Sequence, residues 1–456
     1  MFDEPIAAQP NPMRIAIVST YDELCGIAGY TRALEQQLRP HAEIQVFDLD
    51  QYLLRSPHAR VQRLADRHIR AIADRLRDFD SVNIQLEYGT LGRTHRQILR
   101  RFARLVRASR NVSVTFHTVL GGGSLNWTEI GSKLRRFRLI GAVDEIVRHR
   151  RGRGLSDRTY RFLRSRQRRQ QISIIVHNRR DGRLLRDVFQ LRNVEHHPLS
   201  FIAPAEAREI RSTASRHDFP ILATLPESAR LIGTFGFLSP YKGYETALRA
   251  LKYLPDDYHL LIFGGIHPQV IEKNRVLDPY IQTLLDTAHI GHDMIDTISD
   301  RGAAMTVHLD ASSKDLLGRH PNDLRHRVHF MGVHSDEGFM RAMALCDTVV
   351  LPYLEVGQSS SGPIAMALEM GCRVIASRTH TFLQYARYHP GRIEFFDIGN
   401  YAELADLLCA EPKPAGGDKA LYYNTETNAA LYLAVSQPRS KHKAAVQPRA
   451  VLETTR

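Results

Sequence analysis

The sequence contains no long hydrophobic run and little cysteine. No stretch of its 456 residues approaches the roughly 20 consecutive apolar residues that a membrane-spanning helix needs. The first residues, MFDEPIAAQPNPM, are acidic and rich in proline, unlike a secretory signal peptide. The cysteines stand far apart without metal-ligand spacing, at Cys25, Cys346, Cys372 and Cys409. These absences predict a cytoplasmic protein in a reducing compartment, with no metal site.

Acidic residues are fewer than basic ones. The chain has 49 Asp and Glu against 62 Lys and Arg, a formal net charge of +13. Arginines crowd the segment from Lys133 to Arg169, with few acids among them. Such a segment either attracts an anionic membrane surface or is a solvated helix face. Because no aromatic stacking platform or DNA-reading motif accompanies the charge, we expect a peripheral contact with the inner face of a membrane and no nucleic acid.

The remaining composition is that of a soluble globular protein. Hydrophobic residues make up 43% and charged residues 24% of the chain, and its length favours two domains. Strand patterns alternate with helical patterns in two halves, at residues 13–200 and 230–410, and an irregular proline-containing linker, 201–229, separates them. This alternation predicts an α/β protein with two Rossmann-like, doubly wound domains that face each other across a cleft.

The stretch from Asp347 to Ser377 has the pattern of one β-α-β unit. An apolar run at 348–351 leads into the loop Gln358-Ser359-Ser360-Ser361-Gly362, a helical pattern at 362–369 and a second apolar run at 374–376. A helix N-terminus carries unpaired N–H groups and a partial positive charge, so this loop can seat a phosphate. The alternative is that Ser359 or Ser360 caps the helix.

A lysine follows the first strand pattern of the second half. Lys242 and Gly243 lie between the run Leu231 to Gly236 and a helical pattern. A lysine at a glycine-flanked turn from strand to helix is placed to neutralise a diphosphate. The alternative is a surface lysine at a helix start.

Polar residues follow the strand patterns of the first half. Glu87 comes after the run 81–86, and His117 after the run 112–116. Ligands bind outside the carboxyl ends of parallel strands, so both are candidate functional residues. The alternatives are that Glu87 caps the next turn and that His117 is structural. A predicted loop ending at Gly26 and Gly29 offers a further close approach of backbone to a ligand.

Together these motifs resemble the donor-binding part of retaining glycosyltransferases of the two-Rossmann-domain (GT-B) superfamily, in particular the family that includes sucrose synthases and bacterial mannosyltransferases. The matching positions are Asp347, Pro352, Gly371, Val374 to Ser377, Gly236, Lys242 and Gly243. The chain departs from the family at its two glutamates (Gln358, Met366), its proline (Arg373) and its phosphate-clamp arginine (Phe237). Residues 84–89, IQLEYG, resemble a motif of bacterial exopolysaccharide and lipopolysaccharide glycosyltransferases.

The resemblance implies a retaining glycosyltransferase that uses a nucleotide-diphosphate sugar and no metal or other cofactor. It implies catalytic roles for His117, Glu87 and Lys242 and an acceptor side at Gly26 and Gly29. The donor contacts that it implies are Gly236, Lys242, Gly264, Gly332, Glu355, Gln358, Ser360, Ser361 and Gly362. The implied acceptor is a glycan or lipid-linked intermediate of bacterial surface polysaccharide synthesis. Residues 411–435 are expected to cross back to the first domain, and 436–456 to form a disordered tail.

The departures leave a second function open. Without the two family glutamates and the clamp arginine, the chain can be a catalytically silent member of the fold that binds a nucleotide or glycan or acts as a scaffold. Glu355 and Glu369 lie close enough in the sequence to substitute for the missing glutamates; the alternative is that each is a surface glutamate. The sequence does not choose among UDP, GDP and ADP.

Overall fold

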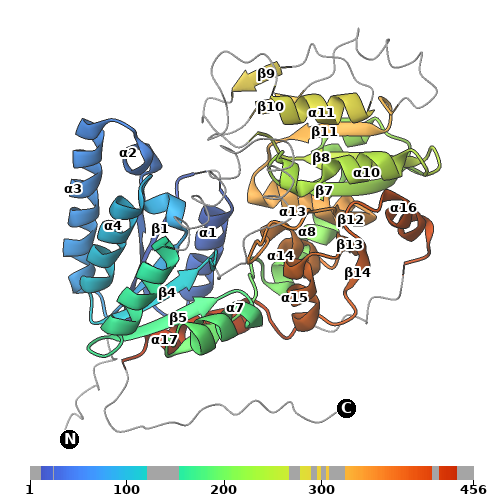
Figure 1. Ribbon diagram of the computed structural model, residues 1–456. Coiled ribbons are helices and arrows are strands. Elements are labelled where there is room, and N and C mark those ends of the chain that lie inside the picture. The colour runs from blue at the N-terminus through green and yellow to red at the C-terminus, as the bar shows by residue number, and fades with distance from the viewer. Residues whose placement is uncertain are drawn as a thin grey trace, which may run out of the picture.

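The computed structural model describes residues 12–23, 25–120, 154–266, 278–288, 295–298, 305–307, 324–412 and 421–438. These residues form two α/β domains (Figure 1). Most of the basic segment Lys133–Arg169, up to residue 153, and the tail beyond residue 438 lie outside the described residues.

The first domain is built on a six-stranded parallel sheet. In spatial order its strands are β2 (Glu43–Asp48), β1 (Arg14–Ser19), β3 (Ser81–Leu86), β4 (Asn111–Phe116), β5 (Gln171–Val176) and β6 (Val194–His196). Strands β3 and β4 are buried along their whole length, as expected for central strands covered by helices on both faces. The helices are α1 (Gly26–Leu38), α2 (Gln51–Arg55), α3 (Ala59–Arg75), α4 (His95–Arg107) and α7 (Arg179–Arg183), and residues 154–166 are also helical.

The second domain contains another six-stranded parallel sheet. Its strands lie in the order β11 (Val328–Gly332), β8 (Tyr258–Phe263), β7 (Arg230–Phe235), β12 (Thr348–Leu351), β13 (Val374–Ser377) and β14 (Ile393–Phe396). Its helices are α10 (Tyr244–Leu251), α11 (Pro279–Ala288), α13 (Asp336–Leu345), α14 (Gly362–Glu369), α15 (His380–Tyr388) and α16 (Tyr401–Cys409). A short antiparallel pair, β9 (Ile295–Ile298) and β10 (Met305–Val307), accompanies this domain. The prediction of two doubly wound Rossmann-like domains is confirmed.

The linker is more regular than its sequence suggested. Within residues 201–229 the chain forms α8 (Pro204–Thr213) and α9 (Pro220–Ala223), so the expectation of an irregular segment was wrong. Both helices begin with a proline, whose fixed φ and missing N–H suit the first helical position. Pro204 and Pro220, which suggested an irregular segment in the sequence, therefore mark the starts of two helices.

The last helix packs against the first domain. Helix α17 (Thr425–Ser436) follows the second domain in the sequence, and its Tyr432 hydroxyl lies 3.2 Å from that of Tyr30 on α1 and 2.9 Å from Thr115 Oγ1 on β4. One hydrophobic cluster runs from α1 and α17 through the linker helix α8 into α14, α15 and β7. The two domains therefore share a core. A second cluster packs α3 and α4 on the opposite face of the first sheet.

Candidate functional site between the domains

The strand order of the second sheet places a ligand site at its centre. Numbered along the domain, the order is 3-2-1-4-5-6, so the chain winds outward in both directions from the adjacent strands β7 and β12. In sheets of this kind the crevice beyond the carboxyl ends of those two strands is the usual ligand site. The loop after β7 carries Lys242, and Pro352 and Tyr353 follow β12. The predicted phosphate-binding lysine therefore lies at the topological switch point.

Lys242 is buried among aromatic rings. Its side chain is only 4% exposed, and its amino group contacts the hydroxyl of Tyr353 and lies 4.0 Å from the centre of that ring and 5.2 Å from the centre of the Tyr241 ring. Burial lowers the pKa of Lys242 to about 7. Among the described residues no carboxylate forms an ion pair with this amine. An anionic ligand would therefore supply the missing counter-charge and favour the protonated amine.

Three glycines line the ends of the neighbouring strands. Gly236, Gly264 and Gly332 end the adjacent strands β7, β8 and β11, and all three have positive φ values, 121°, 139° and 77°. A Cβ atom on Gly264 would lie 1.9 Å from the carbonyl oxygen of Gly236, and one on Gly236 would lie 2.9 Å from Lys242 Nζ. The structure thus brings together three of the predicted donor residues in a side-chain-free edge beside the lysine, where a ligand can approach the backbone.

The serine loop before α14 divides into two roles. Ser361 Oγ donates to the Tyr353 hydroxyl over 3.3 Å, which links this loop to Lys242 through one tyrosine. Ser361 is the N-cap residue, yet its side chain makes no capping bond to the helix. Ser360 and Ser361 are buried, and Gly362 lies against Phe201 of the linker. Of the three predicted residues Ser360, Ser361 and Gly362, Ser361 is thus linked to the lysine through Tyr353. The capping alternative was wrong, because neither Ser359 nor Ser360 is the N-cap residue of α14.

Ser359 instead joins the two domains. Its hydroxyl oxygen accepts from the backbone N–H of Val119 over 3.0 Å, and its carbonyl accepts from Asn178 Nδ2 over 2.9 Å. Both partners follow strands of the first sheet, β4 and β5. The Ser359 side chain also hydrogen-bonds Asp181. Burial raises the pKa of Asp181, and the bond from Ser359 opposes this rise. The loops at the carboxyl ends of both sheets are therefore in direct contact.

We expect Ser359→Ala to lower the free energy of unfolding by about 1–3 kcal/mol, because it leaves the buried Val119 N–H and the Asp181 carboxylate short of a partner. Urea denaturation measures this. Ser212→Ala on α8 is the control, since that exposed hydroxyl bonds only to a carbonyl of its own helix and should change stability by less than about 0.5 kcal/mol. Equal effects of the two substitutions would contradict the bridging role of Ser359.

Glu355 and Gln358 lie at the edge of this site. The exposed Glu355 carboxylate accepts from the backbone N–H groups of Gly357 over 2.9 Å and His380 over 2.7 Å. It therefore organises its own loop and the start of α15. The Gln358 carbonyl accepts from Thr381 Oγ1, and its side chain is partly exposed. No contact among the described residues connects Glu355 with Lys242.

His117 lies in a buried polar network of the first domain. Its Nε2 is 2.7 Å from Gln85 Oε1, and Gln85 Nε2 in turn donates to Asn83 Oδ1 over 2.6 Å. Because the Gln85 oxygen only accepts, His117 carries its proton on Nε2, which leaves a lone pair on Nδ1. Burial lowers the pKa of His117 to about 4. The ring is therefore neutral near pH 7 and suits a hydrogen bond better than charge stabilisation.

His177 accompanies His117 and was not singled out from the sequence. The two ring centres are 5.0 Å apart, and the ring of Tyr30 meets both edge-on at 5.6 and 5.4 Å. His177 Nδ1 lies 3.2 Å from the carbonyl oxygen of His197, and its buried Nε2 has no hydrogen-bond partner among the described residues. An acceptor left unpaired in the interior marks this ring as a candidate ligand contact.

Glu87 lies at the end of β3, as predicted. Its Oε2 accepts from Thr118 Oγ1 over 2.7 Å. Burial raises the pKa of this carboxyl, while the bonds from Thr118 and the Tyr88 N–H oppose the rise. A carboxyl with a raised pKa near the end of a parallel strand can act as a base. The capping alternative was wrong, because Glu87 precedes the next turn as its N-cap residue but its side chain makes no capping bond to it.

Gly26 and Gly29 belong to a helix. Both lie in the first turn of α1, which begins at Gly26 after the N-cap residue Cys25, so the prediction that they form a loop was wrong. A Cβ atom on Gly29 would lie 3.1 Å from a carboxylate oxygen of Asp336 on α13, and Arg32 pairs with the same carboxylate over 2.8 Å. The glycine therefore allows close approach between the domains, which its residue type alone did not reveal.

Tyr353 was not among the residues predicted from the sequence, and Glu369 was predicted only as a substitute glutamate. Tyr353 could have been found from the sequence, since it follows a strand pattern and Pro352. An aromatic residue in that place lies at the carboxyl end of a strand, where ligands bind. Glu369 is buried, not exposed, and binds the linker: it accepts from Ser200 Oγ over 2.6 Å and from the N–H groups of Phe201 and Ile202 over 2.9 and 3.2 Å. Glu369 holds the linker and therefore does not replace a donor-binding glutamate.

Within the described ranges, no three His, Cys, Asp or Glu side chains lie close enough together to hold a metal ion. None of the helices in those same ranges combines the length and the apolar character that crossing a bilayer requires.

Comparison with known proteins gave matches in structure alone. No protein-family model and no curated protein sequence matches the chain. A sucrose-phosphate synthase from Thermosynechococcus elongatus aligns at 14% identity over 93% of this chain and 96% of its own, with a TM-score of 0.53. Alr3699/HepE from Anabaena, in complex with UDP and glucose, aligns at 14% identity over 93% and 97%, with a TM-score of 0.51. A trehalose-phosphate synthase from Burkholderia xenovorans, in complex with glucose-6-phosphate, aligns at 10% identity over 93% and 100%, with a TM-score of 0.54. The chain therefore has the GT-B fold that these proteins share.

Proposed function

We propose that this protein is a glycosyltransferase that moves a sugar from a nucleotide-diphosphate sugar to an acceptor hydroxyl. The observation that carries the proposal is the buried amine of Lys242 at the switch point of the second sheet, next to the glycine ends of β7, β8 and β11. A diphosphate is the ligand class that this arrangement suits, since it supplies the charge that the amine lacks and can approach the exposed backbone. Solved structures of the same fold support it, because one of them holds UDP and glucose.

The chemistry assigns the lysine a specific task. In the transfer, the bond between the anomeric carbon and the diphosphate oxygen breaks, and the leaving diphosphate takes the electron pair. The acceptor oxygen forms the new bond and loses its proton. A fixed cation beside the diphosphate stabilises the charge that develops on it, which is the largest electrostatic need of the step. Lys242 supplies that cation, and the mouth of α14 at Ser360 to Gly362 supplies backbone N–H groups on the same ligand.

The first domain would contact the sugar and the acceptor. His117 accepts a hydrogen bond from a sugar hydroxyl through Nδ1, with Gln85 fixing the ring orientation. Glu87 binds the acceptor hydroxyl or takes its proton. The finer proposals rest on the sequence resemblance: transfer with retention, a glycan or lipid-linked acceptor of surface polysaccharide synthesis, no metal, and a cytoplasmic site of action with membrane contact through the Lys133–Arg169 segment.

We expect His117→Ala to lower the transfer rate by about 10–100-fold while nucleotide binding stays within about threefold, because the lost contact is to the sugar and not to the diphosphate. The wild-type rate should show no inflection near pH 6.5 due to this residue, since its pKa is about 4. Initial rates and nucleotide titrations measured across pH test both points. A loss of nucleotide affinity equal to the loss of rate would contradict a sugar contact.

A second function is favoured by one observation. Position 366, where the resembled family has the ribose-binding glutamate, is a nearly buried methionine on α14. An apolar residue there supports a protein of the same fold that binds a nucleotide or glycan without transferring sugar.

A thermal-shift screen followed by turnover separates the two functions. Wild-type protein is heated with UDP-, GDP- and ADP-sugars, since a ligand that binds the folded state raises the melting temperature by mass action. The donors that give a shift are then assayed for release of the nucleotide. A shift with release supports the transferase, and a shift without release with any acceptor supports the silent binder. No shift with any nucleotide sugar would overturn both.

A further inference from the structure

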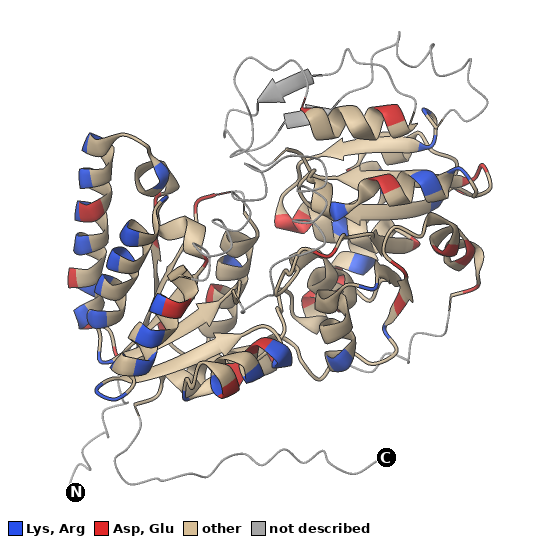
Figure 2. Ribbon diagram, in the orientation of Figure 1, with Lys and Arg blue, Asp and Glu red and all other residues tan. Residues whose placement is uncertain are grey.

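Much of the positive charge of the chain is concentrated on two neighbouring helices. Helices α3 and α4 together carry ten arginines and two aspartates, Asp66 and Asp74, a formal charge of +8 out of +13 for the chain. They cover the face of the first sheet opposite to α1 and α17, and Figure 2 shows the positions of their basic residues, coloured blue, along both helices. Like charges on adjacent helical turns destabilise the free protein, so this surface would gain stability from an anion.

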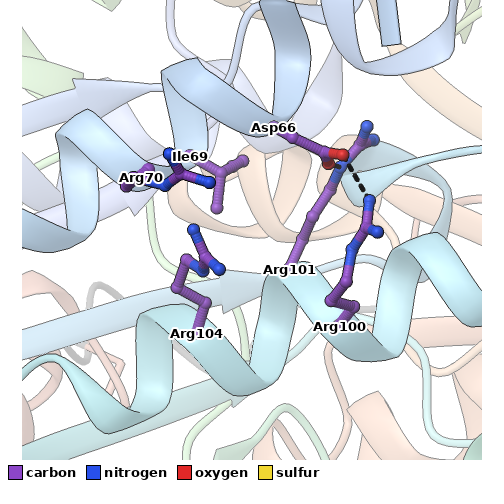
Figure 3. Close-up of a pocket in the computed structure, with 6 residues that line it drawn as sticks. All are labelled: Asp66, Ile69, Arg70, Arg100, Arg101 and Arg104. Carbon is purple, nitrogen blue, oxygen red and sulfur yellow. Dashed lines mark hydrogen bonds and ion pairs between the residues drawn. The ribbon is translucent and has the colours of Figure 1, made fainter. Parts of the chain in front are cut away.

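A cavity of about 90 Å³ lies between these helices (Figure 3). It is lined by Asp66, Ile69, Arg70, Arg100, Arg101 and Arg104. At one end Asp66 pairs with Arg100 and, over 2.9 Å, with Arg101. Although partial burial would raise the pKa of Asp66, the bonds from these two arginines lower it below its ordinary value. At this end of the cavity two arginines therefore share one carboxylate.

Arg101 is a structural residue. It is 1% exposed, and its guanidinium also donates to the carbonyls of Leu54 and Leu91 over 3.2 and 2.9 Å and to Gln62 Oε1 over 2.6 Å. With Asp66 these partners occupy all of its nitrogens. Arg101 therefore holds α4 to α2 and α3, and its buried guanidinium is committed to contacts within the protein.

The other end of the cavity has two arginines and, among the described residues that line it, no carboxylate to pair with them. Arg70 lies one turn beyond Asp66 on α3, and Arg104 lies one turn beyond Arg100 on α4. Where Asp66 is paired with Arg100, the next turn therefore places Arg70 opposite Arg104. Figure 3 shows the Arg104 side chain extending from α4 toward α3. Within the described part of the chain, neither Arg70 nor Arg104 forms a hydrogen bond or ion pair. Two guanidinium groups thus face one cavity without a carboxylate between them.

We propose that Arg70 and Arg104 form a binding site for a phosphate group on the outer face of the first domain. The planar donor forks of arginine match the oxygens of a phosphate, and the cavity has the volume of about three water molecules at roughly 30 Å³ each, enough for a tetrahedral oxyanion. Arg70 is exposed and Arg104 partly exposed, so the ligand enters from solvent. The phosphate belongs either to a soluble phosphorylated compound or to a lipid headgroup.

Site-resolved labelling tests the proposal without depending on the interdomain site. Wild-type protein reacts with phenylglyoxal, an arginine reagent, with and without inorganic pyrophosphate, and mass spectrometry measures each modified arginine. Pyrophosphate should slow labelling of Arg70 and Arg104 and leave Arg63 and Arg96 unchanged, since these exposed arginines of the same helices do not line the cavity. The site would be overturned if neither pyrophosphate nor the vesicles described next changed the labelling of any of these four arginines.

A pair of double variants distinguishes the two sources of phosphate. Arg70→Gln/Arg104→Gln and the control Arg63→Gln/Arg96→Gln remove the same charge from the same helices. Pyrophosphate binding is titrated by calorimetry with each pair of substitutions placed in Lys242→Met protein, so that the interdomain site does not contribute. We expect only the first pair to weaken pyrophosphate binding or vesicle binding, by about tenfold or more. Transferase activity should be unchanged in both double variants when Lys242 is present. Selective loss of binding to phosphatidylcholine vesicles containing phosphatidic acid assigns a lipid headgroup, and selective loss for pyrophosphate alone assigns a soluble phosphate. Equal losses in the two double variants would show nonspecific charge attraction and overturn the proposal.

Discussion

Replacing Lys242 by methionine should lower the transfer rate by about 10³-fold, because removal of one preorganised group that stabilises charge in the transition state costs rates of this order. The loss is expected to be large here because Phe237 stands where the resembled family has a second phosphate-clamp cation. Methionine keeps the length and volume of the buried stem. The measurements are initial rates with the donor that the thermal-shift screen identifies, and the shift that this donor causes, which should disappear.

The stability of the same variant separates a lost cation from a damaged fold. Burial lowers the pKa of Lys242 to about 7, against about 10.4 in an unfolded chain. The unfolded state therefore binds more protons than the folded state between those values, and wild-type stability should rise with pH across this window. Lys242→Met lacks this dependence and should be at least as stable as wild type near pH 7. Lys252→Met, at the end of α10, is the control and should keep activity. An inactive but strongly destabilised Lys242→Met protein would contradict the assigned role.

The fold could be predicted because its signals are local. Runs such as Ser81–Leu86 and Asn111–Phe116 are apolar enough to be buried on both faces, and their alternation with helical patterns left little choice but doubly wound sheets. Helix α14 has the predicted bounds, Gly362–Glu369. The errors fall where one residue type serves two purposes. Proline starts α8 and α9, and Gly26 and Gly29 admit a neighbouring domain in the first turn of α1.

The candidate site was predictable only in part. Lys242 and the glycines after the strands could be found because a strand-glycine-helix sequence has one common use near phosphates. The roles of Tyr353 and Ser359 could not be predicted, since their partners lie more than 100 residues away in the sequence. The role of His177 could not either, because only the folded sheet brings it beside His117 and Tyr30. The charge of the arginine-rich helices was visible as composition, but Arg70 faces Arg104 only once α3 and α4 lie side by side.

Glu369→Ala should be the most destabilising substitution at the domain junction, lowering the free energy of unfolding by about 3 kcal/mol or more near pH 5. The Glu369 carboxyl accepts from Ser200 and from the N–H groups of Phe201 and Ile202 in the linker. Alanine leaves these buried donors without a partner, and each such group costs about 1–3 kcal/mol. Urea denaturation measures the loss, and the exposed Glu227→Ala is the control.

The pH dependence of this loss follows from burial. Burial raises the pKa of Glu369 to about 7, although the three bonds from the linker oppose the rise; an unfolded chain has a glutamate pKa of about 4.3. Between these values the folded state binds more protons than the unfolded state, so the stabilisation due to Glu369 is complete below about pH 4.3 and is lost as pH rises through about 7. The difference between wild type and Glu369→Ala should therefore narrow from pH 5 to pH 8. Glu369→Gln keeps one acceptor oxygen and does not titrate. Its free energy of unfolding should lie between those of wild type and Glu369→Ala, without the pH dependence due to Glu369. A gap that widens with pH would show that the folded protein favours the charged carboxylate, and that the linker bonds, not burial, control this residue.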